Sequence, residues 1–555
     1  MCLPLIRDIS ADRLPALITS TIRGPQLLTV VRRRIENSIG IIDIFAGPGG
    51  LGEGFSSFEP NAGYRPFRIG VSAEMEQSAH ATLRLRAFYR LLREREGNMP
   101  KQYLAYLQAA AAGKALPPES HFADGPLRTL WEEAAQEALN LKLGEPEHNS
   151  ALYERINEVR QRHERLVLIG GPPCQAYSVV GRARQRNVKG FRTRGDHRHF
   201  LYREYLEILS RFTPDVFIME NVKGILSSTV GGRNMFASIR EDLMDPGQAL
   251  GKASSASVAS HRYVLLPIHL ESGSSRCPER AAGDPKEFVI RCENHGVPQA
   301  RHRVIIMGVR ADHADRALGV AGLHIPDVHP RLTDALSGLP TLRSGLSRRA
   351  DVPNEWASAM ERQKKRVSSA LSRGSTSLRN RILSIPVDPA LPRGSITYAA
   401  EPTGFAAQLW HRDQQVVVNH ETRGHMESDL GRYLFCASYA MEHGRCLPLT
   451  EFPEVLKPEH ANTDSGDFAD RFRVQLPNRP SSTITSHLSK DGHAFIHWDA
   501  SQCRSLTVRE AARLQTFSDD YLFLGNRTQQ FVQVGNAVPP IIARQIAKVV
   551  WSILD

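Results

Sequence analysis

Six short apolar runs, each ended by turn residues, recur through the first 310 residues of this 555-residue chain. They cover residues 41–45, 67–73, 166–170, 215–219, 262–268 and 303–309. Segments of helical character, such as 77–90 and 201–212, lie between several of them. Because alternating strands and helices are typical of a mostly parallel sheet, the pattern predicts an α/β fold with its ligand sites at the carboxyl ends of the strands.

Two long stretches break this alternation and suggest how the chain is divided. Residues 88–163 are rich in Ala, Glu and Leu and predict a helical insertion, whereas 321–480 are irregular and rich in Pro, Ser, Arg and His. Helical sequence returns after residue 505, so the irregular segment is expected to interrupt one domain rather than follow it. The expected parts are an N-terminal extension (1–38), a main domain (39–320), a second domain (321–480) and a C-terminal part that completes the main domain (481–555).

Composition narrows the classes of function. Lys and Arg number 70 against 59 Asp and Glu, a formal charge of +11, which favours a polyanionic partner only weakly, because many basic proteins bind no nucleic acid. The seven cysteines are scattered, and Cys277, Cys292 and His295 are too irregularly spaced to predict a metal site. No uncharged apolar stretch approaches the roughly 18 residues that span a bilayer and no signal-peptide pattern is present, so a soluble cytoplasmic protein is expected.

The first apolar run leads directly into a glycine-rich turn, in the sequence IIDIFAGPGGLGEGF. Gly47, Gly49 and Gly52 satisfy the pattern GxGxxG, and Glu74 ends the next run. Such a turn lets the backbone approach a ligand closely, and the acid can bind ribose hydroxyls. The pattern fits a dinucleotide as well as any other adenosine ligand, and a glycine turn without a ligand is the plainer alternative.

Reactive or charged side chains follow three other runs. Cys174 comes after two prolines at a strand end, where a scaffold can fix the direction of a nucleophilic thiolate. Glu220 ends the run at 215–219 and could donate a proton to a ring nitrogen of a substrate. Arg301 and Arg303 alternate, so both side chains share one face and imply an anionic partner. The plainer alternatives are a packed thiol, a capping carboxylate and a surface ladder of ion pairs.

A basic segment follows Cys174. Residues 182–198 hold seven Arg and Lys against one acid, Asp196. The segment is either a solvated basic loop or an arm that contacts phosphates beside the thiol. Further along the chain, Arg423, His487 and Lys490 are candidates for contact with an anionic partner, although such residues mostly meet phosphate or solvent.

Together these pieces resemble the DNA (cytosine-5) methyltransferase family of bacterial restriction-modification systems. DIFAGPGG resembles the S-adenosylmethionine turn of that family, GGPPCQAYS its nucleophile motif, MENV its glutamate motif and QARHR its paired-arginine motif. RSLTVREAARLQTF and QVGNAVPP follow in the order of the family. The resemblance covers about 40–310 and 479–555 and implies a Rossmann-like S-adenosylmethionine-dependent domain with a smaller target recognition domain inserted.

The resemblance also implies roles for single residues. Cys174 would add to C6 of a cytosine flipped out of double-stranded DNA, Glu220 would hold the N3 and N4 edge, and Arg301 and Arg303 would position the base. No metal is implied. The implied contacts to S-adenosylmethionine come from Phe45, Gly47, Pro48, Gly50, Glu74, Met75, Pro173, Leu201, Asn536 and Ala537.

The chain departs from the family pattern at a few of these positions. Met75 stands where an aromatic residue is common, and Ala537 stands where a serine is common. Asp124 is a candidate for the acid that binds the adenine amino group.

Three other functions compete with this interpretation. A nicotinamide-dependent oxidoreductase explains the glycine turn but leaves the other motifs unused. A tRNA cytosine-5 methyltransferase would share the catalytic residues, but the long segment 321–480 favours an enzyme that reads duplex DNA. A catalytically inactive DNA-binding relative is disfavoured by the intact motifs. The expectation is a monomeric DNA cytosine-5 methyltransferase, with a cognate restriction endonuclease for the same site as a further candidate partner.

Overall fold

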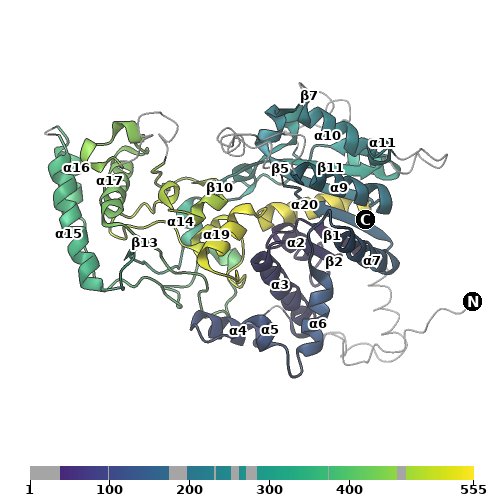
Figure 1. Ribbon diagram of the computed structural model, residues 1–555, viewed down its shortest axis with the longest axis horizontal. Coiled ribbons are helices and arrows are strands. Elements are labelled where there is room, and N and C mark those ends of the chain that lie inside the picture. The colour runs from purple at the N-terminus through teal and green to yellow at the C-terminus, as the bar shows by residue number, and fades with distance from the viewer. Residues whose placement is uncertain are drawn as a thin grey trace, which may run out of the picture.

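The computed structural model describes residues 38–97, 99–173, 197–230, 233–251, 262–269, 284–372, 374–458 and 471–555. Cys174 and nearly all of the basic segment 182–198 lie outside these residues. Figure 1 shows two lobes of unequal size. The larger lobe comprises the described residues of 38–323 and 538–555, and the smaller lobe comprises those of 344–476.

A sheet of eight strands forms the middle of the larger lobe, in the order β3-β2-β1-β4-β5-β11-β8, with β9 paired to β11. The strands are β1 (Ile39–Ile44), β2 (Phe67–Glu74), β3 (Ala138–Asn140), β4 (Arg165–Gly170), β5 (Val216–Val222), β8 (Tyr263–Leu266), β9 (Val289–Arg291) and β11 (His302–Arg310). The first five run parallel, whereas β11 is antiparallel to β5, β8 and β9. All six apolar runs form strands of this sheet, which confirms the predicted α/β class.

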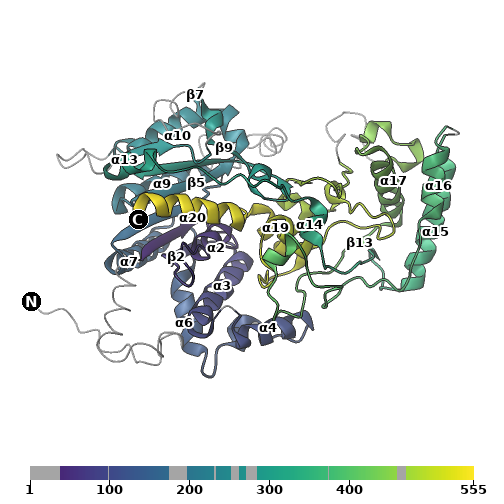
Figure 2. The same ribbon diagram turned by 180° about the vertical axis from the view of Figure 1, so that it is seen from behind.

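Helices cover both faces of the sheet, which explains why its strands are apolar on both sides. On one face, α2 (Gly50–Ser56) and α20 (Pro540–Leu554) share a buried cluster with β1 and β5. Figure 2 shows α20 lying along the sheet beside α2. The other face is covered by α7 (Pro146–Arg162), α9 (His197–Phe212) and α10 (Met235–Met244).

The packing of α2 on α20 requires glycine. A Cβ at Gly50 would lie 2.3 Å from the carbonyl oxygen of Val538, and one at Gly54 would lie 2.3 Å from the Cβ of Ala543. The glycines after the first strand therefore serve two purposes, because they form the turn and also admit the C-terminal segment to the core. Residues at the two ends of the described chain thus build one lobe.

The stretch 88–163 differs from the uniform helical insertion that the sequence predicts. It contains the end of α3 (Gln77–Glu96), then α4 (Lys101–Ala111), α5 (Pro118–His121), α6 (Arg128–Glu137) and α7. Between α6 and α7 lies β3, which pairs in parallel with β2 at the edge of the central sheet. A strand of three residues between long helices is too short to show an alternation of apolar and polar residues, so the sequence does not predict this strand.

The irregular segment 321–480 folds around helices. Its longer helices are α15 (Pro353–Ala370), α16 (Thr376–Ser384) and α17 (Glu427–His443), which pack around Trp356, Leu430 and Phe435. Shorter elements complete the fold: α11 (Pro246–Ala249), α13 (Ala314–Leu318), α14 (Leu332–Leu336), α18 (Val508–Leu514), α19 (Arg527–Asn536), β6 (Thr229–Val230), β7 (Arg233–Asn234), β10 (Gln299–Ala300), β12 (Gly345–Leu346), β13 (Gly424–His425) and β14 (Ser481–Ser482).

One stretch, Arg527–Leu554, is long and apolar enough by composition to cross a membrane. Of its most apolar window, 67% is buried inside the protein, and the chain bends between α19 and α20. Burial against the sheet accounts for this composition, since a core helix passes the same test.

Candidate active site

The glycine-rich turn connects β1 to α2, and several of its residues adopt the left-handed backbone conformation with a positive φ angle. Phe45, Gly47 and Gly49 have φ angles of 56°, 57° and 96°. The amide of Gly47 donates to one oxygen of Glu74 at 2.8 Å, and the amide of Glu76 donates to the other at 2.7 Å. Burial raises the pKa of Glu74 above its usual value. The carboxylate is thus fixed beside the turn, at the ends of β1 and β2, where it can accept hydrogen bonds from vicinal hydroxyls.

Other residues assigned to the cofactor lie around this turn. The carbonyl of Pro48 accepts a hydrogen bond from the Tyr521 hydroxyl, and Met75 is 59% exposed. The backbone of Val538 lies against Gly50, which brings the neighbouring Ala537 close to the turn. The remaining assigned residues are Leu201, which is buried in α9, Asn536, which is exposed at the end of α19, and Pro173, the last described residue before Cys174.

The carboxyl end of β3 carries Asn140, which sequence reasoning did not consider. Its side-chain amide donates to the carbonyl oxygen of Glu74 at 2.9 Å. Asp124, the candidate for the adenine amino group, lies in the connection between α5 and α6. Asn140 could be placed beside Glu74 from the sequence only if residues 138–140 were predicted to be a strand.

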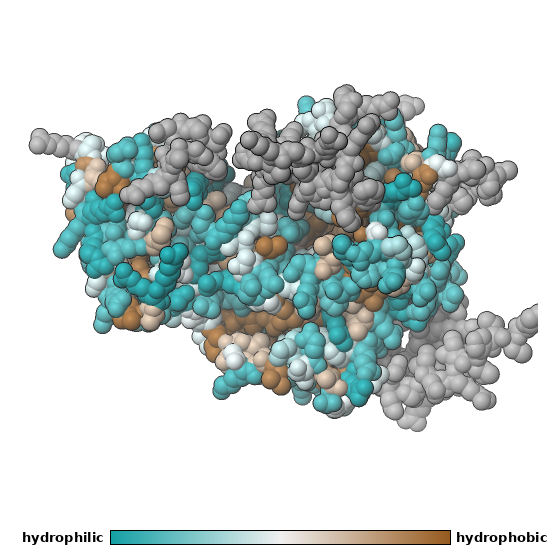
Figure 3. Space-filling model, in the orientation of Figure 1, coloured by the Kyte–Doolittle hydropathy of each residue, from teal (hydrophilic) through white to brown (hydrophobic). Residues whose placement is uncertain are grey.

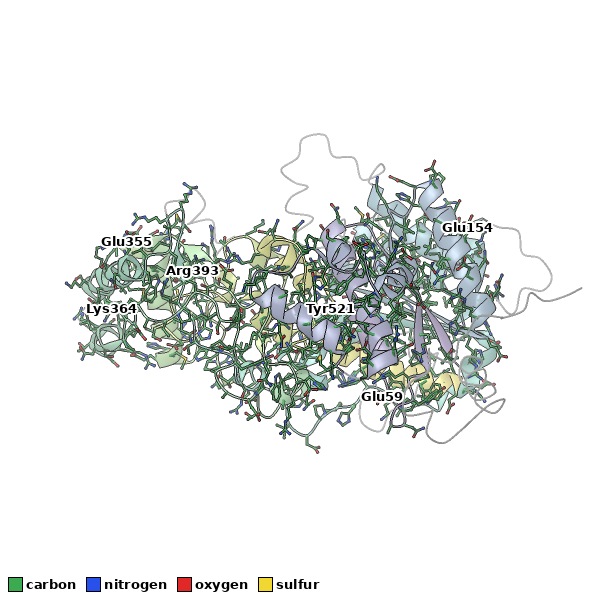
Figure 4. All side chains as sticks on the ribbon, turned by 90° about the horizontal axis from the view of Figure 1, so that it is seen from below. Glu59, Glu154, Glu355, Lys364, Arg393 and Tyr521 are labelled. Atoms are coloured by element: carbon green, nitrogen blue, oxygen red, sulfur yellow. The ribbon has the colours of Figure 1, made fainter. Side chains whose placement is uncertain are left out.

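A buried charge network beneath the turn fixes it to the C-terminal part of the chain. The Arg86 guanidinium donates to Glu53 at 2.6 and 2.9 Å and to Asp520 at 2.7 Å. It also lies over the rings of Tyr89 and Tyr521, 3.9 and 4.7 Å from their centroids. Figure 4 shows Tyr521 near the middle of the molecule. Burial by itself would raise the pKa of Glu53, but Arg86 outweighs it and lowers that pKa.

Asp43, on β1, is a buried acid whose nearest backbone donor is the amide of Gly52. A Cβ at Gly52 would lie 2.9 Å from its Oδ2 atom, so the carboxyl packs directly against α2. Burial raises the pKa of Asp43 to about 8. A carboxyl with that pKa is mostly protonated at pH 7.

Replacing Asp43 by asparagine is expected to stabilise the protein in a pH-dependent way. The folded pKa lies above the unfolded value of about 3.9, so the contribution of Asp43 to stability is fully present below about pH 4 and is lost as the pH rises to about 8. Asparagine has no proton to lose. Asp43→Asn should exceed the wild type in free energy of unfolding by about 3–5 kcal/mol at pH 8 and by about 1 kcal/mol at pH 5.

Urea unfolding of the cofactor-free protein at the two pH values measures this difference. The control is Glu154→Gln, an exposed acid on α7 that Figure 4 labels at the far end of the larger lobe. A gain for Asp43→Asn that does not change with pH would contradict the assignment of a neutral carboxyl.

Glu220 and Arg303 form an ion pair at the end of the sheet where the parallel strands finish, which is the end that also carries Glu74. Glu220 Oε1 lies 2.7 Å from Arg303 Nε, and the two side chains are 13% and 14% exposed. They come from neighbouring antiparallel strands, β5 and β11. A Cβ at Gly171 would lie 2.9 Å from Glu220 Oε2, so the backbone three residues before Cys174 touches this carboxylate. The start of the nucleophile segment and the acid are therefore brought together, while Cys174 itself lies outside the described residues.

Arg301 differs from its neighbour. Gln299 and Arg301 are fully buried, whereas Arg303 is partly exposed beside Glu220. The Arg301 guanidinium donates to the carbonyl oxygens of Ile484 at 2.8 Å and Gly535 at 3.3 Å. Burial lowers its pKa to about 9. In this structure Arg301 ties β11 to the C-terminal segment, and its bonds are made to carbonyls rather than to an anion.

Arg423 is likewise engaged within the protein. It donates to the carbonyl oxygens of Leu488 at 2.6 Å and Lys490 at 2.9 Å, and it lies 4.7 Å from the centroid of the Phe531 ring. Burial lowers its pKa to about 10. Arg423 therefore fixes the backbone of the segment that carries His487 and Lys490. Both of these side chains are exposed.

Cysteine and histidine side chains do not assemble into a metal centre in the part of the chain that the structure describes, where no group of three or more His, Cys, Asp or Glu side chains is arranged to hold an ion. Cys292 is buried, which raises its pKa to about 12, and His295 bonds to the carbonyl of His324. Cys277 lies outside the described residues.

A hollow of about 970 Å³ lies between the α4–α5 hairpin and loops of the smaller lobe, where Figure 3 shows apolar surface low in the middle of the molecule. Leu116 and Ile396 are exposed on its walls. Glu74, Glu220 and Arg303 do not line it, so this space is separate from the strand ends described above.

Comparison with known proteins shows similarity over most of the chain. Residues 106–248 and 286–552 match the family of C-5 cytosine-specific DNA methylases. The type II methyltransferase M.Bpa9945I of Bacillus paralicheniformis is 31% identical over 93% of this chain and 99% of its own length. The DNA (cytosine-5-)-methyltransferase M.ApeKI of Aeropyrum pernix is 24% identical over 70% of this chain and 81% of its own length. Among solved structures, an E. coli prophage protein assigned as a DNA modification methyltransferase aligns with a TM-score of 0.46 at 19% identity, over 93% of this chain and 99% of that one.

Proposed function

The chain belongs to the C-5 cytosine-specific DNA methylase family and is a DNA (cytosine-5-)-methyltransferase, and we propose that it methylates a flipped-out cytosine through a covalent bond to Cys174. One observation carries this proposal. The Glu220–Arg303 pair lies under the segment that leads to Cys174, at the same sheet edge as the turn held by Glu74. Nucleophile, acid and cofactor site would then meet at one place.

The residues around the turn fit S-adenosylmethionine, which supplies the methyl group when bound. Residues with positive φ angles form the turn between β1 and α2. Two backbone amides donate to the Glu74 carboxylate and fix it where ribose hydroxyls can reach it. We assign Phe45, Gly47, Pro48, Gly50, Glu74, Met75, Pro173, Leu201, Asn536 and Ala537 to this site. Met75, which is exposed, would cover the adenine less well than an aromatic ring would.

The chemistry on the base falls to three side chains. Cys174 Sγ would add to C6 of cytosine, which makes C5 nucleophilic enough to take the methyl group. Loss of the C5 proton then lets the bond between Sγ and C6 break, which frees the thiolate. Glu220 holds the N3 and N4 edge and keeps the ring protonated during the addition. Arg303 keeps the Glu220 carboxylate oriented through their ion pair. A base inside a duplex is out of reach, so flipping it out costs about a few kcal/mol.

The relatives indicate the biological setting. Two of them are type II methyltransferases, from Bacillus paralicheniformis and Thalassovita gelatinovora, the second 28% identical over 69% of this chain and 82% of its own length. We propose that this chain is the cytoplasmic, monomeric modification enzyme of such a system, paired with a restriction endonuclease for the same site. The segment 321–480, which includes the smaller lobe, would be its target recognition domain, inserted into a catalytic domain completed by residues 481–555.

Bisulfite sequencing of host DNA tests the activity. Expression in a host without cytosine methylation should leave one short sequence almost fully methylated at a single cytosine, whereas expression of Cys174→Ala should leave the genome unmethylated. Methylation of transfer RNA in place of DNA would favour the tRNA methyltransferase alternative. An unmethylated genome with a folded wild-type protein would contradict the proposal.

A further inference from the structure

A second hollow, of about 400 Å³, lies between the two lobes. Its walls are formed by Ala300 of the larger lobe, by 445–448 and 472–476 of the smaller lobe, and by 479–482. Arg445, Arg473 and Arg479 line it, and the described residues around it include no carboxylate. The hollow is therefore strongly positive, in a protein whose partner is a polyanion.

Two of these arginines are open to a ligand. Arg445 and Arg479 are exposed, and neither forms an ion pair with a carboxylate of the described residues. Arg479 donates to the carbonyl of Gly444 at 2.9 Å, and Arg445 lies 5.5 Å from the centroid of the Tyr439 ring. Each guanidinium keeps several N–H donors free, and the fork geometry of these donors matches the oxygens of a phosphate.

A further residue of the wall, Ser481, carries a buried hydroxyl. Ser481 is 1% exposed, and its Oγ atom has no hydrogen-bond partner. A buried polar atom without a partner is costly unless a ligand or water satisfies it. Although Ser481 is a residue of the wall, its Oγ atom is closed off from the surface, so the arginines supply the donors that a ligand in the hollow can reach.

The strand pairing locates this hollow relative to the active site. β14, which contains Ser481, pairs with β10, so that Ala300 lies opposite Ser482. Ala300 precedes Arg303, the partner of Glu220, by three residues in the chain. The hollow therefore lies beside the strand that carries Arg303.

We propose that Arg445 and Arg479 bind backbone phosphates of duplex DNA close to the target cytosine. The inference rests on the proposed function and names residues that would hold its substrate. Phosphate contacts fix the position of a protein on the duplex without reading bases. The site would therefore seat the DNA between the lobes, while sequence is read elsewhere.

The test is the double variant Arg445→Ala/Arg479→Ala. Its affinity for duplex DNA should fall by about 10–100-fold near 0.1 M salt, and the slope of log affinity against log salt should become shallower by about 1–2. The loss should be equal for duplexes with and without the methylation site, and kcat at saturating DNA should be unchanged. The matched control is Arg160→Ala/Arg162→Ala, which removes the same charge from α7, at the end of the larger lobe away from the smaller one (Figure 1), and should bind like the wild type.

A second measurement locates the contact on the DNA. Neutral methylphosphonate groups, introduced one at a time close to the target, should weaken the wild type but cause no further loss in the double variant. If the arginine pair serves an acidic protein instead of DNA, the double variant will bind DNA with the wild-type salt slope, and the proposal is overturned. That result with an active wild type rejects only the phosphate site, whereas a wild type that neither binds nor methylates DNA rejects the proposed function. If the double variant does not fold, Arg445→Gln and Arg479→Gln are measured singly, each with an expected slope change of about 1.

Discussion

Cys174→Ser is expected to lower the rate of methyl transfer by about 10⁴–10⁶-fold while leaving the affinities for DNA and S-adenosylmethionine within about twofold. A thiol ionises near neutral pH and its thiolate is a strong nucleophile, whereas a serine hydroxyl remains protonated and adds poorly to a ring carbon. Serine keeps nearly the same shape. The substitution therefore removes the covalent step and little else.

Single-turnover transfer of a labelled methyl group measures the loss, and trapping on DNA that contains 5-fluorocytosine measures the bond itself. The wild type should form an adduct that depends on S-adenosylmethionine, and Cys174→Ser should form none. The control is Cys292→Ala, because burial raises the pKa of Cys292 to about 12 and such a thiol cannot serve as a nucleophile at neutral pH. An adduct of wild-type yield with Cys174→Ser would overturn the assignment.

The fold was predictable where the sequence carried a local signal. Apolar runs such as 41–45 and 303–309 are long enough to show a strand and are ended by turn residues, and all six lie in the central sheet. β3 has three residues between two helices, and its pairing with β2 is set by contacts that no local pattern encodes. The helices of the smaller lobe were missed because Pro- and Ser-rich connections separate them and dominate the composition of 321–480.

The candidate site divides in the same way. The ion pair of Glu220 with Arg303 joins two strand ends whose chemistry could be read from the sequence. The partners of Arg301 could not be read, because Ile484 and Gly535 are 183 and 234 residues further along the chain. Every residue type also has a backbone carbonyl, so the amino-acid sequence does not indicate which carbonyl accepts a hydrogen bond. The spacing of the two arginines thus indicates a shared face but does not reveal which of them meets the acid.

Glu220→Gln is expected to lower kcat by about 10²–10⁴-fold with little change in the affinity for DNA. The amide of glutamine has nearly the shape of the carboxylate but cannot hold a proton for the ring during the addition of Cys174. It also leaves the Arg303 guanidinium, which is 14% exposed, without its carboxylate partner. The thermal midpoint of the variant reports this second cost separately from the loss of rate.

Two variants separate the chemical role of Glu220 from its contribution to structure. Arg303→Lys keeps a positive charge beside Glu220 but loses the guanidinium fork, so it should lower kcat less than Glu220→Gln does. Glu293→Gln removes a nearby carboxylate that lies 2.7 Å from His302, the neighbour of Arg303, and it should leave kcat within about twofold of the wild type. A loss confined to DNA affinity would make Glu220 a positioning residue. Equal losses of kcat in Glu220→Gln and Glu293→Gln would show that any missing charge at this sheet edge slows the enzyme, and the proton-holding role would then have to be abandoned.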